Sequence, residues 1–177
     1  TLFDKKYLCK FIYFFGPNDE DLKYIYSKYG KFLKNNNCSI HVRRGKDYLK
    51  IASKYNPEFI LKESYYYKAL DHFKDKNIDN FLVFSDNMEY SKNFFSKNFP
   101  NLNFIFIRER DFIDLWIISL CKNNILSNST FSMWGSFLNK NKNKIVIAPK
   151  KTNKYENDKI NKKILNTSYE KSWIVMS

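Results

Sequence analysis

Two adjacent arginines are the residues of this chain best suited to chemistry. The stretch at 39–48 reads SIHVRRGKDY, an apolar run that ends in Arg43, Arg44 and a glycine turn. A guanidinium stays charged and donates two parallel hydrogen bonds, which suits a pyrophosphate. The alternative interpretation is structural, with the arginines closing a strand and forming salt bridges to Asp47 or Asp86.

Two further polar turns follow apolar runs. Residues 121–135 read CKNNILSNSTFSMWG, a strand pattern that passes through a hydroxyl-rich turn into a helix. The first turn of a helix offers free N–H groups and a positive dipole end, so small hydroxyl side chains there either cap the helix or bind a phosphate. Residues 81–87, FLVFSDN, end in Asp86 and Asn87, which accept hydrogen bonds from a base or ribose or form a plain turn.

The elements that must position these turns alternate along the chain. Runs rich in Ile, Val and Phe predict strands, and helical spacing of apolar residues predicts helices between them. The expected strands are 38–43, 80–85, 103–107, 124–127 and 144–148, and the expected helices are 19–33, 63–73, 88–98, 111–122 and 131–139.

This alternation predicts a Rossmann-like, doubly wound α/β fold with a parallel sheet and helices on both faces. The strand order stays open. Ligands of such sheets bind beyond the carboxyl ends of the strands, where Arg43 and Arg44 fall. Strand alternation places His41 and Arg43 on one face and directs Arg44 away from His41.

Composition and charge narrow the function classes. The chain has 177 residues, 44% of them hydrophobic, which is ample for the core of one ordinary domain. Its net charge of +13 first suggests nucleic acid, an anionic membrane surface or an acidic substrate. Only four of the 31 basic residues are arginines, and the lysines are scattered. We therefore expect a diffuse lysine coat and no nucleic-acid partner.

Several other classes are excluded by simple patterns. No apolar run reaches 18 residues, so we expect no integral membrane segment. The start, TLFDKKYLCKF, does not resemble a signal peptide, which predicts a cytoplasmic protein. The three cysteines have no CxxC spacing, and the four glycines form neither a dinucleotide fingerprint nor a Walker A loop. Any nucleotide site must use side chains and a helix N-terminus.

Together the three polar stretches resemble a known family. They match, in order and spacing, the motifs of the α-1,2-fucosyltransferases of glycosyltransferase family 11. The matching segments are HVRRGKDY at 41–48, FSDN at 84–87 and NSTFSMWG at 128–135. The resemblance covers residues 38–151.

The resemblance implies the donor-binding domain of a GT-B-type enzyme. Such an enzyme transfers L-fucose from GDP-β-L-fucose to the 2-hydroxyl of a β-galactoside-containing glycan, with inversion and without a metal or other cofactor. Arg43 would hold the β-phosphate with support from His41 and Arg44, and Asp86 would bind guanosine. The residues that would line the phosphate side are Asn128, Ser129, Thr130 and Ser132.

An inverting transfer needs a group that accepts the proton of the acceptor hydroxyl. Asp47 is the expected general base. The competing use of Asp47 is as a structural partner of Arg43 or Arg44. Lys46 is inserted before it, where the family usually has Gly followed directly by Asp. Weaker candidates for the base are Glu89, Glu109 and Asp111, and His72 is expected at the surface.

The resemblance also suggests a division of the chain. Residues 1–37 are interpreted as a short helical leader, a remnant of an N-terminal domain. Residues 38–151 form the GDP-fucose-binding domain, and 152–177 a polar helix or tail. The alternatives left open are a truncated, catalytically silent GDP-sugar-binding domain and a fucosyltransferase of other linkage.

Overall fold

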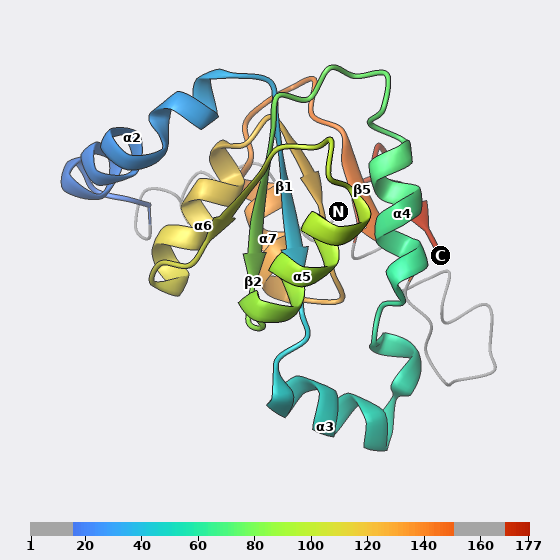
Figure 1. The fold of residues 1–177 in the computed structure, drawn as a ribbon. Helices are drawn as coiled ribbons and strands as arrows, with labels where there is room; N and C mark the ends of the chain where they lie inside the picture. The colour runs from blue at the N-terminus through green and yellow to red at the C-terminus, as the bar shows by residue number, and fades with distance from the viewer. Residues whose placement is uncertain (1–15, 151–168) are drawn as a thin grey trace.

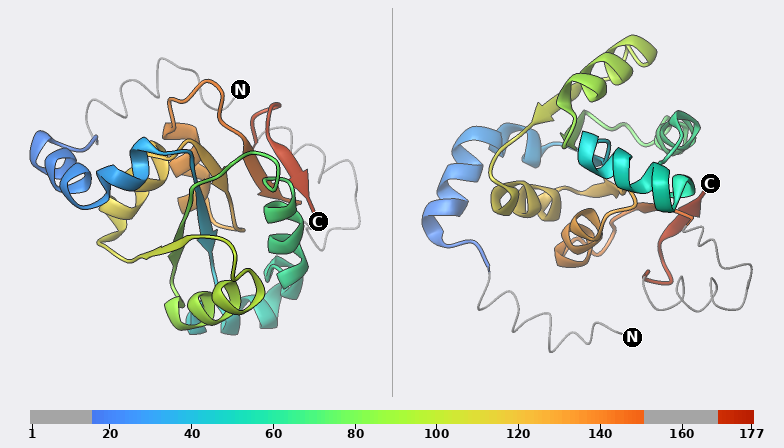
Figure 2. Two further views of the ribbon diagram at one scale, coloured as in Figure 1. Left: turned by 45° about the horizontal axis from the view of Figure 1, so that its top comes forward. Right: turned by 90° about the horizontal axis from the view of Figure 1, so that it is seen from below.

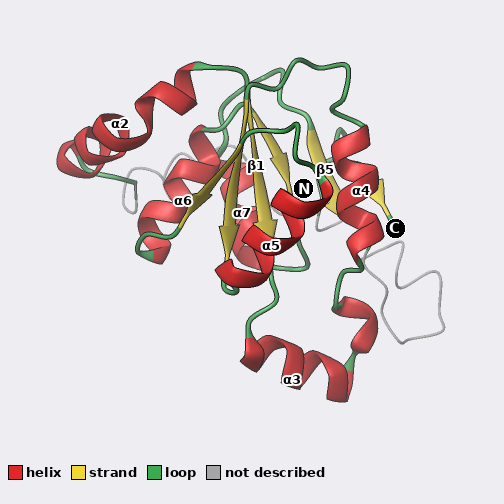
Figure 3. Cartoon of the chain, in the orientation of Figure 1, coloured by secondary structure: helices red, strands yellow, loops and turns green. Residues whose placement is uncertain are grey.

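A computed structural model describes residues 16–150 and 169–177 of the chain. The elements alternate between helices and strands, as Figures 1 and 3 show. In chain order they are α2 (Asp19–Lys34), β1 (Asn37–Val42), α3 (Lys46–Tyr55), the 3₁₀ turn η1 (Pro57–Phe59), α4 (Glu63–Asp71), β2 (Asn80–Ser85), α5 (Met88–Asn98), β3 (Phe104–Ile107), α6 (Asp111–Leu120), β4 (Asn123–Ile125), α7 (Thr130–Leu138), β5 (Val146–Pro149) and β6 (Ile174–Met176).

The strands form one parallel sheet in the order β3-β2-β1-β4-β5-β6. This is the Rossmann strand order, in which the chain reverses direction across the sheet beside β1. Val42 of β1 pairs with Ser85 of β2, and Ile40 pairs with Ile125 of β4. The carboxyl ends of β1, β2 and β4 therefore lie next to each other at the switch point.

Helices cover both faces of the sheet, as the two views in Figure 2 show. On one face, Ile40 and Val42 pack with side chains of α4 and α5. On the other, Leu82 and Phe84 pack with α2 and α6. All six residues of the central strand β1 are buried. The predicted doubly wound architecture is thus confirmed.

Helix α2 belongs to this core. Ile25 and Leu33 of α2 lie in the same buried cluster as Trp116 of α6. The helix starts with a capping box, in which Asn18 and Asp21 exchange side-chain and backbone hydrogen bonds. Within the segment interpreted as a leader, the described part thus contains a helix that is packed against the sheet, while residues 1–15 lie outside the described residues. The domain division at residue 37 stays a prediction.

Two elements differ from the expected pattern. Residues 46–55, expected to begin as a turn, form α3, which extends beyond the sheet at the carboxyl ends of the strands (Figure 1). Only Ala52 of this helix is buried. Within the expected polar tail, Ile174–Met176 forms β6, paired in parallel with β5. The rest of that tail up to residue 168 lies outside the described residues.

Buried asparagines tie the amino ends of the central strands together. Asn124 Nδ2 donates to Ser39 Oγ at 2.7 Å, and Asn139 Nδ2 donates to Asn124 Oδ1 at 2.9 Å. Asn123 Nδ2 donates to the backbone oxygen of Asn37 at 3.1 Å. These amides satisfy buried polar groups where β4 is only three residues long. Part of the asparagine-rich composition is thus structural.

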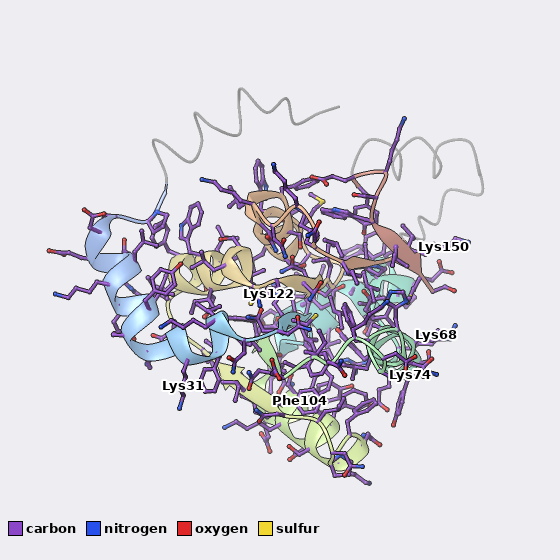
Figure 4. The ribbon with its side chains drawn as sticks, turned by 90° about the horizontal axis from the view of Figure 1, so that it is seen from above. Lys31, Lys68, Lys74, Phe104, Lys122 and Lys150 are labelled. Carbon is purple, nitrogen blue, oxygen red and sulfur yellow. The ribbon has the colours of Figure 1, made fainter. Side chains whose placement is uncertain are left out.

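The lysines lie mainly around the outside. In Figure 4, Lys68, Lys74 and Lys150 lie along one side of the molecule, Lys31 lies on the opposite side and Lys122 lies between them. No helix in the two described ranges is long and apolar enough to cross a membrane.

Candidate functional site

The site is built on an ion pair at the carboxyl ends of β1 and β2. Because Val42 and Ser85 are partners in the sheet, the residues that follow them, Arg43 and Asp86, are brought together. Arg43 Nη1 lies 2.8 Å from Asp86 Oδ2, and the Arg43 side chain is still 44% exposed. Of the two salt-bridge partners left open by the sequence, the structure thus selects Asp86. The guanidinium is fixed at one nitrogen and open to solvent.

Gly45 allows Asp86 to approach this closely. A Cβ at position 45 would lie 2.6 Å from Asp86 Oδ2 and 2.9 Å from its Cγ, closer than such atoms can pack. The backbone conformation of Gly45 is ordinary, with φ of −64°. The glycine is therefore needed for space beside the carboxylate.

Arg44 has a different environment from Arg43. Its backbone N–H donates to Asp86 Oδ1 at 2.6 Å, and its Nη2 donates to the backbone oxygen of Leu61 at 2.7 Å. The guanidinium lies over the ring of Tyr90, 4.5 Å from its centroid. Arg44 thus joins the end of β1 to α5 and to the segment before α4. Its predicted supporting role on the phosphate stays a prediction.

His41 is buried under the turn that precedes α7. Its Nδ1 lies 2.6 Å from Ser127 Oγ, and its ring contacts that of Phe131. Burial lowers the pKa of His41 to about 4, partly offset by the charge of Asp86. The imidazole is therefore neutral at pH 7 and contributes hydrogen bonding rather than charge.

The hydroxyl-rich turn after β4 mainly organises its own backbone. Ser129 is the N-cap of α7, and its Oγ accepts from the backbone N–H of Phe131 at 3.3 Å. Ser132 is fully buried, and its Oγ donates to the Ser129 backbone oxygen at 3.1 Å. Thr130, the first residue of the helix, is exposed. The capping interpretation holds for Ser129, while contact of these residues with a phosphate stays a prediction.

Asn128 reaches across to the segment after α3. Its Nδ2 donates to the backbone oxygen of Phe59 at 2.9 Å, and its Oδ1 is buried without a hydrogen-bond partner among the described residues. Tyr48 Oη donates to the same Phe59 oxygen at 2.8 Å. Tyr48 is the last residue of the motif HVRRGKDY at 41–48, which was the signal available for it in the sequence, whereas no local pattern pointed to Phe59.

The expected general base, Asp47, is open to solvent. Asp47 is exposed in the first turn of α3 and forms no ion pair with Arg43, Arg44 or any other described residue. Glu89 and Asp111 are likewise exposed, in the first turns of α5 and α6.

Glu109 is held in place by α2. Its carboxylate accepts from Lys28 Nζ at 2.5 Å and from the hydroxyls of Tyr24 and Tyr29. Burial opposes ionisation, but these hydrogen bonds together lower the pKa of Glu109. A carboxylate with three donors and a lowered pKa is a poor proton acceptor. His72, at the end of α4, is partly exposed.

The described residues contain no cluster of three or more His, Cys, Asp or Glu side chains that could hold a metal ion. Cys38 and Cys121 are both buried and free. Burial raises the pKa of each thiol, so both are unreactive core residues.

Two curated proteins of Escherichia coli are similar to this chain. The O-antigen biosynthesis glycosyltransferase WbnK is 40% identical over 121 residues, covering 66% of this chain and 39% of the relative. An alpha-1,2-colitosyltransferase is 32% identical over 130 residues, covering 71% of this chain and 43% of the relative. The chain therefore spans about two fifths of the length of these relatives.

The fold has a counterpart among solved structures. The crystal structure of POFUT1 in complex with GDP-fucose superposes with a TM-score of 0.55 at 9% identity, covering 68% of this chain and 42% of that one. At this identity the likeness concerns the fold alone, and it agrees with the GT-B-type Rossmann-like sheet expected from the sequence.

A family model extends the resemblance beyond the three motifs. The model of glycosyl transferase family 11 matches residues 13–177, whereas the motifs and their neighbours reach only from 38 to 151. Helix α2 and strand β6 thus lie within the region that the family model matches. With nearly the whole chain matched, the protein belongs to glycosyl transferase family 11.

Proposed function

We propose that this chain forms the donor-binding part of an inverting α-1,2-fucosyltransferase. It would bind GDP-β-L-fucose and transfer the fucose to the 2-hydroxyl of a β-galactoside-containing glycan, without a metal. The observation that carries the proposal is the guanidinium of Arg43. It stands at the switch point of the sheet, fixed by Asp86 at Nη1 and 44% exposed.

The chemistry of the leaving group explains why such a guanidinium is useful. When the sugar leaves, negative charge develops on the β-phosphate of GDP, and donors that are already oriented stabilise it most effectively. Asp86 orients Arg43 in the absence of substrate, so little rearrangement is needed. A stabilisation of ~3 kcal/mol at this point corresponds to roughly a hundredfold in rate.

The remaining assignments follow the same geometry. Neutral His41 and the start of α7 would face the phosphate side, with Thr130 exposed at the helix N-terminus. Asp86 would contact guanosine as well as Arg43, since each carboxylate oxygen can accept more than one hydrogen bond.

Asp47 is proposed as the general base, and Asp47→Asn should then lower kcat with little change in GDP affinity.

Activity is tested by incubating the chain with GDP-fucose and lactose, with and without EDTA. We expect fucosylated lactose in both reactions. Loss of product in EDTA would contradict the metal-free mechanism. A chain that binds GDP but yields no product would be a donor-binding part that needs the remainder of a longer protein.

A second donor is favoured by one observation, the 32% identity to an alpha-1,2-colitosyltransferase. Colitose is fucose without its 3-hydroxyl. A site that hydrogen-bonds this hydroxyl rejects the deoxy sugar strongly, whereas an apolar site does not. Comparing kcat/KM for the two GDP sugars, with the same acceptor, distinguishes the two donors.

A further inference from the structure

Tyr48 contacts both Arg43, the exposed arginine of the site, and the chain segment that follows α3. It lies in the first turn of α3, half-buried, and its ring stands 5.4 Å from Cζ of Arg43. Its hydroxyl donates to the backbone oxygen of Phe59 at 2.8 Å. One side chain thus contacts both the guanidinium and the chain segment that follows α3.

That segment, residues 57–61, is held by side chains from three parts of the site. Asn128 Nδ2, at the end of β4, donates to the Phe59 oxygen at 2.9 Å, the same oxygen that accepts from Tyr48. Arg44 Nη2, at the end of β1, donates to the Leu61 oxygen at 2.7 Å. Residues 57–61 are therefore tied to the carboxyl ends of β1 and β4.

Arg43 needs such support because its guanidinium is otherwise held at one point. Asp86 fixes Nη1, while the long side chain keeps rotamer freedom about that contact. An aromatic face beside the guanidinium restricts this freedom and favours its charge. The ring can do so only while its own orientation is fixed, and the bond to Phe59 fixes it.

We propose that Tyr48 is a positioning residue for Arg43. Its ring holds the guanidinium in the orientation that receives the pyrophosphate, and its hydroxyl anchors the ring to residues 57–61. This inference rests on the proposed function, because it concerns the binding of a GDP sugar at Arg43.

A double-mutant cycle tests the inference, with GDP as the probe and calorimetry as the readout. Tyr48→Leu removes ring and hydroxyl, and Tyr48→Phe removes the hydroxyl alone. Each is made in the wild-type chain and in Arg43→Gln. Loss of the cation–π interaction between Arg43 and the Tyr48 ring should weaken GDP binding about threefold to tenfold in Tyr48→Leu. The loss of affinity should be smaller in Tyr48→Phe, which keeps the ring.

The decisive expectation is that neither substitution weakens GDP binding further in the Arg43→Gln background. Tyr55→Leu is the matched control, because Tyr55 lies on the same helix and is 63% exposed. It should leave GDP affinity unchanged. Thermal unfolding of each variant shows whether it folds. If Tyr48→Leu does not fold, the cycle with Tyr48→Phe alone decides whether Tyr48 acts through Arg43.

Two results would overturn the inference alone. One is an equal loss of affinity in both backgrounds, which would mean that Tyr48 acts independently of Arg43. The other is unchanged affinity in the Tyr48 variants while Arg43→Gln weakens binding. A wild-type chain that does not bind GDP would instead refute the proposed function, and the inference with it.

Discussion

Arg43 and Arg44 are neighbours in the chain, but their side chains have different contacts: Arg43 is exposed beside Asp86, whereas Arg44 packs within the fold. Arg44 bonds to Leu61 and stacks on Tyr90, so its removal leaves a gap between β1, α5 and residues 57–61. We expect Arg44→Ala to lower the free energy of unfolding by about 2 kcal/mol, a typical cost for breaking a partly buried network. Urea unfolding followed by circular dichroism measures this.

The exposed Lys50→Ala on α3 is a suitable control, and its unfolding midpoint should match the wild type. An Arg44→Ala variant as stable as this control would show that the contacts of Arg44 contribute little to the fold.

His41 makes the stability of the fold depend on pH. Its pKa is about 4 when folded, below the ordinary value of 6.5, because burial disfavours the charged imidazolium. As the pH falls from 6.5 towards 4, the unfolded chain therefore binds the proton first, and stability decreases by up to ~3 kcal/mol.

His41→Gln should reduce this pH dependence between 6.5 and 4, which unfolding measured at several pH values detects. The comparison must be made against the wild type. Burial raises the pKa of Asp114 to about 7, which makes stability change with pH in the opposite sense in both proteins. Identical profiles for wild type and variant would contradict the buried, neutral state of His41.

At the scale of elements, α6 and α7 pack closely through a glycine. A Cβ at Gly135 would lie 2.4 Å from Ile118 Cγ2 and 3.1 Å from its Cβ. Ile118 is branched and fully buried, so it has little room to move. We expect Gly135→Ala to destabilise the fold by roughly 1–3 kcal/mol, as overpacking of cores usually does, and thermal unfolding measures the effect.

Gly30 provides the matched control for this prediction. It lies inside α2, and a Cβ there would meet only Tyr26, at 3.8 Å, an ordinary contact. Gly30→Ala should therefore stabilise the protein by about 0.5–1 kcal/mol through helix propensity. Destabilisation of the same size at both positions would contradict the close packing of α6 on α7.

The elements also show what local patterns reveal and what they miss. The apolar strands were predicted to within a few residues because each reads as a continuous apolar run, and β1, β2, β4 and β5 are buried on both faces. The edge strand β3 is only half-buried, but it keeps the same apolar pattern. Helix α3 was missed because it packs little against the sheet and has only Ala52 buried. Strand β6 was missed because its three residues become a strand only by pairing with β5.

In the candidate site too, local sequence patterns predict residue types better than the contacts between them. The sequence identified Arg43 and Asp86, but the pairing of β1 with β2 decides that they meet, and register depends on the whole sheet. The contact of Tyr48 with the Phe59 oxygen depends on the course of residues 57–61, for which no local pattern exists. The residues proposed to bind the donor could therefore be named from the sequence, whereas the contacts that position them could not.

At the scale of the molecule, the large positive charge and the site are separate features. The labelled lysines in Figure 4 come from both sides and the middle of the molecule, while the proposed donor site depends on one exposed arginine held by one aspartate. A diffuse coat steers an anionic sugar nucleotide weakly and is screened by salt. GDP affinity should therefore fall only modestly between low and physiological ionic strength.

Arg43 is proposed to hold the pyrophosphate of a GDP sugar. Calorimetric titration of GDP into the wild type and into Arg43→Ala tests this role, with unfolding midpoints measured in parallel. We expect binding to the wild type and at least about tenfold weaker binding to the folded variant, because a charge-assisted hydrogen bond to the pyrophosphate is lost. Equal GDP affinity of the two proteins would contradict it.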